Sequence, residues 1–220
     1  MAVRKIPKNY LFVTGGYASR KNESMDGFES LLEKEYLLLL DFDDSVEGFD
    51  VQPVRISVPS IPRGYVPDVL VRYRPDVQTG EIRRSELTEV KTTQDLERND
   101  EKYAPKFDAG RQYALERGWM FRIVTETDIR TPRLSNLKFL REYRNVTVGP
   151  EDMQAVTERL RRVGGNSSSL ALLSDLAPTD DEKLRWIPVI WSMVLNKHLV
   201  TDLDEPFTGD VAVAFQETFR

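Results

Sequence analysis

The spacing of hydrophobic and polar residues changes along the first half of the chain. Residues 26–41 carry apolar side chains at helical spacing, and the stripe is so wide that we expect a buried helix, with Ser24 or Asp26 as its N-cap. Residues 65–73 and 82–92 alternate between apolar and polar side chains instead, which predicts two neighbouring strands joined by a polar turn. The pattern therefore predicts a helix followed by a pair of strands.

Further helices and strands are expected around this pair. An extended segment is predicted at residues 46–56 and a buried strand at 119–125. Helices are predicted at 105–117 and 134–143, a loop at 57–64, and a mobile loop or frayed helix start at 93–104. This order is typical of an α/β domain with a mixed sheet flanked by helices. We expect residues 1–24 to be a flexible N-terminal arm and residues 25–148 to form this domain.

A second domain is predicted where the composition changes, at Gly149-Pro150. Helices are predicted at residues 150–163, 170–176 and 180–196, followed by a hairpin of residues 198–201 and 211–215. Three helices followed by a hairpin are typical of the winged helix, a helix-turn-helix variant. We therefore expect residues 149–220 to form a small winged-helix-like C-terminal domain.

The composition excludes several kinds of site. The chain has 220 residues, no cysteine and a single histidine, His198, so thiol chemistry and multi-histidine metal sites are excluded. Any metal must be bound by oxygen ligands, which favours a hard cation such as Mg²⁺. No apolar run is long enough to span a membrane, and the first residues lack an apolar signal core. The net charge of −5 argues mildly against an obligate nucleic-acid binder, although local patches matter more than the sum.

The candidate chemistry lies at the ends of the two predicted strands. Asp68 begins one strand, and Glu89 and Lys91 share a face near the end of the other. Two carboxylates and the Val90 carbonyl can bind a metal for phosphodiester hydrolysis, and a lysine can stabilise the developing charge. Glu33 of the preceding helix is the most suitable third carboxylate. From the triplet alone, a solvated cross-strand ion pair remains the alternative.

Five segments of the first domain carry a further signal: FESLLEKEYLLLLDFDDSVEGFDVQP at residues 28–53, PDVLV at 67–71, EVK at 89–91, RGWMFRIVTE at 117–126 and IRTPRLSNL at 129–137. They resemble TnsA, the endonuclease subunit of heteromeric Tn7-like transposases. The resemblance implies a restriction-endonuclease-like fold and a catalytic set of Glu33, Asp68, Glu89 and Lys91. The expected cofactor is Mg²⁺, or Mn²⁺ in its place, bound by Asp68, Glu89, the Val90 carbonyl and Glu33.

The resemblance further implies a function in transposition. TnsA cuts the 5′ ends of the transposon, while a DDE transposase, TnsB, cuts and joins the 3′ ends, so the element moves by cut-and-paste. An AAA+ regulator, TnsC, contacts the C-terminal region of TnsA. The expected partners are therefore transposon-end DNA, a TnsB-like transposase and a TnsC-like regulator. The expected location is the bacterial cytoplasm, associated with the nucleoid when active.

Basic residues near the predicted site are candidates for DNA binding. They are Lys102, Lys106, Arg111, Arg130, Arg133, Lys138 and Arg141. Solvated helix faces are the alternative explanation. The predicted last helix opens with acidic residues, so we favour protein docking for the second domain, with DNA contact secondary. The rival functions are a stand-alone restriction or resolvase-type nuclease and a non-catalytic adaptor that binds transposition proteins.

Overall fold

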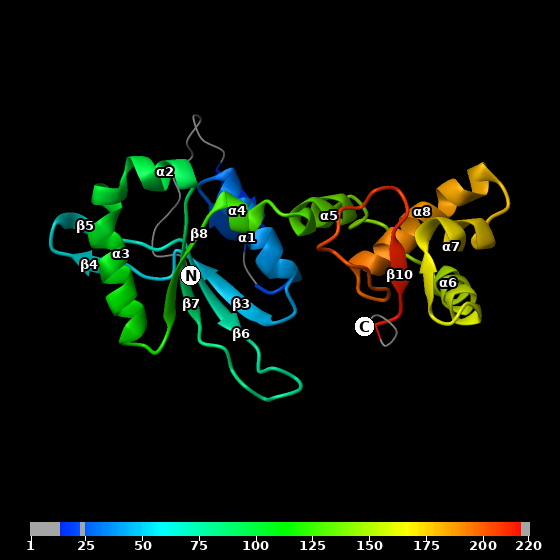
Figure 1. The fold of residues 1–220 in the computed structure, drawn as a ribbon, viewed down its shortest axis with the longest axis horizontal. Coiled ribbons are helices and arrows are strands. Elements are labelled where there is room, and N and C mark those ends of the chain that lie inside the picture. Colours follow the sequence, from blue (N-terminus) through cyan, green and yellow to red (C-terminus); the bar gives the residue numbers. More distant parts are fainter. Residues whose placement is uncertain (1–13, 23–24, 217–220) are drawn as a thin grey trace. The chain divides into compact units, whose positions relative to one another are not determined.

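The computed structural model describes residues 14–22 and 25–216 (Figure 1). Packing divides the chain into two compact units, Met1–Arg130 and Thr131–Arg220. The division falls earlier than the change in composition at Gly149-Pro150, because helix α5 (Pro132–Arg141) packs against helix α8 (Asp180–Leu195) of the second unit. Among the described residues, no helix is both long and apolar enough to cross a membrane.

A mixed four-stranded sheet forms the centre of the first unit (Figure 1). Its strands lie in the order β3 (Val46–Val51), β6 (Val69–Tyr73), β7 (Glu86–Val90) and β8 (Met120–Val124). The first two neighbouring pairs are antiparallel, whereas β7 and β8 run parallel. All five residues of β7 are buried, as expected for a central strand. The predicted mixed sheet flanked by helices is confirmed.

Helix α1 (Leu31–Phe42) covers one face of the sheet through contacts with β3 and β7. Its N-cap is Ser30, whose hydroxyl accepts a hydrogen bond from the amide of Glu33. Of the predicted caps, Ser24 lies outside the described residues, and Asp26 lies in strand β2 (Asp26–Phe28). The helix therefore begins later than the apolar spacing suggested.

A short strand precedes α1 in the segment that the sequence assigned to a flexible arm. Residues Gly15–Tyr17 form β1, which pairs antiparallel with β2. Tyr17 is buried, and its hydroxyl donates a hydrogen bond to Asp41 of α1 at 3.1 Å. These described residues are thus part of the folded unit, while residues 1–13 of the predicted arm lie outside the described part of the chain.

The opposite face of the sheet is covered by helix α3 (Asp100–Leu115) and by a hairpin of β4 (Ile56–Val58) and β5 (Ile61–Tyr65). The core on this face contains Ile56, Val58, Tyr65, Leu70, Leu87 and Ala114. The prediction of a loop at 57–64 was wrong, because apolar residues on both sides of the turn pack against α3.

Two further segments differ from the prediction. The segment expected as a mobile loop or frayed helix start at 93–104 contains helix α2 (Thr93–Arg98), capped by the Thr92 side chain, and the first turn of α3. Strand β8 was expected to be buried but lies at the edge of the sheet, where only Val124 is fully buried. Helix α4 (Glu126–Ile129) follows it and contacts α1.

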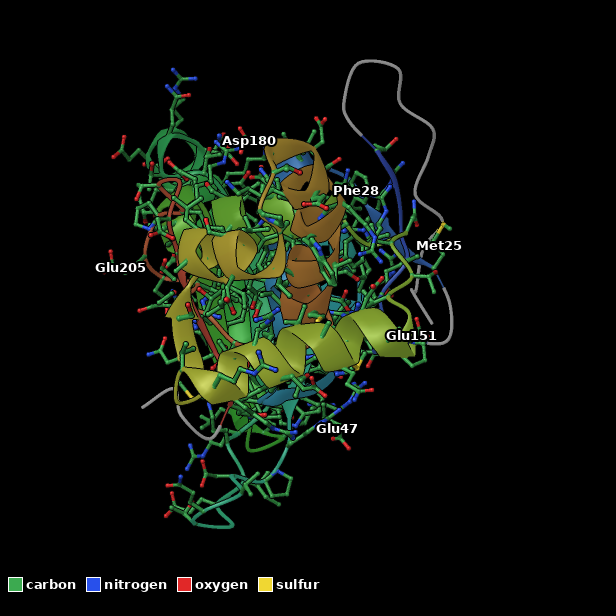
Figure 2. The ribbon with its side chains drawn as sticks, turned by 90° about the vertical axis from the view of Figure 1, so that its right-hand side faces the viewer. Met25, Phe28, Glu47, Glu151, Asp180 and Glu205 are labelled. Carbon is green, nitrogen blue, oxygen red and sulfur yellow. The ribbon has the colours of Figure 1, made fainter. Side chains whose placement is uncertain are left out.

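The second unit consists mainly of helices. They are α5, α6 (Pro150–Arg162), α7 (Ser169–Leu176) and α8 (Asp180–Leu195). Pro150 starts α6, and Thr179 and Glu182 form the capping box of α8, both as predicted. Figure 2 labels two acidic residues in the first turns of these helices, Glu151 in α6 and Asp180 in α8. Carboxylates at these positions complement the helix dipole.

The strands of the second unit differ from the predicted hairpin. Strand β10 (Ala212–Ala214) pairs antiparallel with β9 (Asn166–Ser168), which precedes α7. Between the two predicted hairpin segments, only an isolated bridge joins Val200 to Ala214 among the described strand pairings. The winged-helix assignment of this unit therefore stays a prediction.

Candidate active site

A cavity of about 420 Å³ opens on the first unit where the hairpin, α1, α3 and two sheet strands meet. Its polar lining comes from Glu29, Glu33, Arg55, Arg63, Tyr65, Asp68, Glu89, Lys91, Lys102, Tyr103 and Lys106. All four residues of the predicted catalytic set therefore line one cavity, although they come from distant parts of the sequence. Both acidic and basic groups line it, which suits a polyanionic substrate and a cation together.

The backbone holds Asp68 firmly at the start of β6. Its amide donates a hydrogen bond to the carbonyl of Thr88 at 3.1 Å, and its carbonyl accepts one from the amide of Gln52 at 2.8 Å. The carboxylate accepts a further bond from the amide of Val90 at 2.8 Å. Gln52 has a φ of +49°, a strained conformation for a residue other than glycine, so the Gln52-Pro53 step is part of the scaffold behind Asp68.

Lys91 lies between the two strand carboxylates. Its Nζ atom is 2.8 Å from Oε1 of Glu89 and 3.4 Å from Oδ2 of Asp68. It also donates a hydrogen bond to the Val90 carbonyl at 3.0 Å. The ammonium group thus contacts the same three residues whose oxygens were predicted as metal ligands.

Glu33 is held at the N-terminus of α1. One carboxylate oxygen accepts a hydrogen bond from the amide of Glu29 at 2.8 Å, and the other accepts one from the hydroxyl of Ser30 at 3.0 Å. Burial, reinforced by the Asp68 carboxylate, raises the pKa of Glu33 to about 7. The helix cap therefore fixes the Glu33 carboxylate at the cavity, where its negative charge is only weakly compensated.

The pKa values of Glu89 and Lys91 are also strongly shifted. Burial and the charge of Asp68 raise the pKa of Glu89 to about 7, although Lys91 opposes the shift. Burial lowers the pKa of Lys91, but Asp68 and Glu89 outweigh it, so the pKa of the ammonium rises above its usual value. Lys91 therefore stays protonated at neutral pH and acts here as a cation. Buried carboxylates with raised pKa values favour the arrival of further positive charge.

Two tyrosines complete the cavity wall. The hydroxyl of Tyr65 donates a 2.7 Å hydrogen bond to Oε2 of Glu89, and both side chains are buried. The ring of Tyr103 has three ammonium groups near it, with Nζ of Lys91, Lys102 and Lys106 at 6.0, 5.7 and 5.4 Å from its centroid. The sequence assigned no role to either tyrosine, because the contacts of Tyr65 with Glu89 and of Tyr103 with Lys91 join different elements of the fold.

The oxygen donors at the cavity fit a hard divalent cation in their chemistry. Asp68 and Glu89 supply carboxylates on adjacent strands, and Val90 supplies a carbonyl oxygen. In the described part of the chain, no group of three or more acidic or histidine side chains is close enough to bind one metal ion. Glu33 therefore does not complete a three-carboxylate set in this conformation, in which Lys91 bridges the other two carboxylates.

The predicted DNA-binding residues have different surroundings. Lys102 and Lys106 line the cavity. Arg111, on the same helix, pairs with Asp108 at 2.6 Å and is not among the residues that line the cavity. Arg130 donates a hydrogen bond at 2.9 Å to Glu35, a buried residue of α1.

The remaining three predicted residues belong to helix α5 of the second unit. Arg133 makes two hydrogen bonds to Asp204 at 2.7 and 2.8 Å. Lys138 and Arg141 lie in the last turn of the helix. Their assignment to DNA binding stays a prediction.

The sequence analysis missed two basic residues at the cavity, Arg55 and Arg63. Both are exposed residues of the β4–β5 hairpin region, and Nη1 of Arg55 donates a 2.5 Å hydrogen bond to the carbonyl of Arg63. The signal that could have found them is the alternation of Arg55, Ile56, Ser57 and Val58, which places the arginine opposite the buried face. This alternation was not recognised, because the segment that follows Ile56 was expected to be a loop.

The mixed sheet between helices, with its acidic cluster and lysine at the strand ends, fits a nuclease domain of the restriction-endonuclease-like fold. Residues 43–126 match the family described as TnsA-like endonuclease N terminal, so this part of the chain is a TnsA-like endonuclease domain. The match includes Asp68, Glu89 and Lys91 and confirms the resemblance noted in the sequence, whereas Glu33 precedes the matched segment. No curated protein matches the chain.

Proposed function

We propose that this protein is the DNA endonuclease subunit of a heteromeric transposase and cuts the 5′ ends of a transposon. The observation that supports this most is the gathering of Glu33, Asp68, Glu89 and Lys91 at one cavity of a TnsA-like endonuclease domain. The proposed partners are transposon-end DNA, a TnsB-like DDE transposase and a TnsC-like AAA+ regulator. With both strands cut, the element would move by cut-and-paste.

In the proposed mechanism, Asp68, Glu89 and the Val90 carbonyl would hold Mg²⁺, and Glu33 would complete the site directly or through water. Mn²⁺ could replace Mg²⁺. The chemistry that the ion supplies when bound is Lewis-acid polarisation of the scissile phosphate. Lys91 keeps its proton, so it orients the attacking water by donating a hydrogen bond and stabilises the negative charge that develops on the phosphate. For this it must turn away from the ligand oxygens that it contacts here.

The basic residues of the cavity indicate how the DNA strand reaches the site. Arg55 and Arg63 belong to the hairpin region, and Lys102 and Lys106 belong to α3, so cations from two separate elements line the cavity. Phosphate groups on either side of the scissile bond would contact these side chains. The short basic helix α5 is a further candidate through Lys138 and Arg141.

The proposal is tested by cleavage of donor DNA with the cognate transposase, with the cuts mapped on each strand separately. Asp68→Ala should abolish cutting at the 5′ ends and leave cutting and joining at the 3′ ends in place. Asp108→Ala, an exposed carboxylate on α3, serves as the matched control and should keep both activities. If Asp68→Ala retained 5′ cleavage in a folded protein, the assignment of the site would be wrong.

The same assay separates the rival functions. A stand-alone restriction or resolvase-type nuclease would cut DNA without the transposase. A non-catalytic adaptor would leave the 5′ ends uncut, and it would show no Mg²⁺ or Mn²⁺ binding that disappears in Asp68→Ala. The net charge of −5 favours dependence on partners, because an acidic chain attracts DNA weakly on its own.

A further inference from the structure

Glu89 has a defined partner at each carboxylate oxygen. Oε2 accepts the 2.7 Å hydrogen bond from the Tyr65 hydroxyl, and Oε1 lies 2.8 Å from Nζ of Lys91. Glu89 and Tyr65 are each only 4% exposed, so water cannot readily replace the phenol as the partner of Oε2. The orientation of the carboxylate is therefore set by a phenol on one side and an ammonium group on the other.

Tyr65 is itself held by the fold. It ends strand β5, pairs with Ile56 of β4 and packs in the core between the hairpin, the sheet and α3. The preceding residue, Gly64, has a φ of +64°, and a Cβ atom there would lie 2.5 Å from the carbonyl oxygen of Ile56. Only glycine suits this close approach, which brings the chain into the position where Tyr65 faces Glu89.

The chemistry of the two groups fixes the direction of the bond. An ionised carboxylate oxygen can only accept, so the buried 2.7 Å contact is donated by the Tyr65 hydroxyl. A donor at Oε2 leaves Oε1 facing Lys91 and the cavity, on the side from which a cation must approach.

We propose that Tyr65 is a positioning residue for Glu89: it orients the carboxylate so that Oε1 is presented to the divalent cation. The proposal rests on the proposed metal-dependent nuclease function and adds a role for the β4–β5 hairpin. The hairpin then does more than pack against α3, because it delivers the hydroxyl that orders the ligand.

The test is Tyr65→Phe in the full chain, with Mn²⁺ alone as the probe and its affinity measured by calorimetry. The expected result is a loss of affinity of about 10- to 100-fold, the usual effect of removing a hydrogen bond behind a metal ligand. Tyr17→Phe is the matched control, since Tyr17 is also buried and donates to a buried carboxylate, Asp41, but lies outside the cavity lining. It should leave Mn²⁺ affinity unchanged.

Cleavage kinetics give a second readout. In the presence of the transposase, Tyr65→Phe should lower kcat with an unchanged KM for donor DNA, and raised Mn²⁺ should restore much of kcat. A Tyr65→Phe protein that binds Mn²⁺ like the unchanged chain, while Asp68→Ala loses binding, would overturn the positioning role alone. An unchanged chain that binds no Mn²⁺ would overturn the proposed metal-dependent function and the positioning role together.

Discussion

At the scale of single residues, Lys91 has two roles that conflict. Its ammonium group compensates the charges of Asp68 and Glu89 and occupies the Val90 carbonyl, so it stabilises the site without metal. The same contacts occupy the oxygens that a divalent cation would need. Removing Lys91 should therefore separate stability, metal binding and catalysis.

The first prediction concerns Lys91→Ala. Without metal, the variant should be less stable by roughly 3 kcal/mol, at the low end for breaking a buried ion pair, because Glu89 can take up a proton. Mg²⁺ should then raise the thermal midpoint more than in the unchanged chain, since the cation no longer competes with the ammonium group. Cleavage at the 5′ end should fall at least about 100-fold.

Thermal unfolding with and without Mg²⁺ checks this prediction, and donor cleavage checks the activity. Lys102→Ala is the control, because Lys102 lines the same cavity but is an exposed residue. It should change neither the metal-free midpoint nor the Mg²⁺ shift. A smaller Mg²⁺ shift in Lys91→Ala would contradict the idea that the lysine and the metal compete.

The members of the cluster differ in how far the sequence predicted them. Glu89 and Lys91 could be placed together because strand alternation brings residues two positions apart onto one side. Asp68 could be placed beside them because its strand was expected to be the neighbour of theirs. Glu33 was assigned to the site through the resemblance and its position on an apolar helix. Its role in capping α1 was not predicted, because the helix was expected to start earlier. Tyr65 could not be found, because its hydrogen bond joins strands of separate sheets.

At the scale of elements, a buried asparagine connects helix α5 to the segment before β10. Asn136 is 3% exposed, and its Nδ2 donates to the carbonyls of Leu203 and Glu205 at 2.9 and 2.7 Å. Its Oδ1 accepts a bond from the amide of Phe207 at 3.2 Å. The amide side chain thus fixes an irregular segment that has no strand partners of its own over these residues.

The second prediction is that Asn136→Ala lowers the free energy of unfolding of the second unit by about 1–3 kcal/mol, because three backbone groups lose their partner. Native-state amide hydrogen exchange measures this separately in each unit. Exchange should quicken in α5 and residues 203–207 and stay unchanged in β7. Asn166→Ala, at an exposed position of β9, is the control. Equal effects from the two variants would argue against the role of Asn136.

Elements with their own sequence signals were predicted best. Pro150 and the Thr179 capping box located the starts of α6 and α8, since both signals act within a single helical turn. The β4–β5 hairpin was missed because its strands are short and because Pro59, in the turn, and Pro62, in β5, usually indicate a loop. Its stability comes from packing against α3, which local patterns do not reveal.

At the scale of the whole molecule, charge decides how the protein meets DNA. The net charge is −5, yet several cationic side chains line one cavity of the first unit. A duplex should therefore be attracted locally and weakly, with an affinity that depends on the few side chains that reach phosphates. Helix α3 provides a pair for comparison: Lys106 lines the cavity, and Arg111 lies outside its lining and pairs with Asp108.

The third prediction uses this pair. Lys106→Ala should reduce the slope of log affinity against log salt by about one, the value expected for the loss of one phosphate contact, whereas Arg111→Ala should leave the slope unchanged. Anisotropy of a short labelled duplex, titrated at several salt concentrations, measures both slopes. If Arg111→Ala lowered the slope as much, the DNA would follow the outer face of α3, and the path through the cavity would be wrong. If only Lys106→Ala lowers it, the acidic chain binds DNA through the same cavity that holds its carboxylates, and cutting then requires that the cation and the phosphate enter this cavity together.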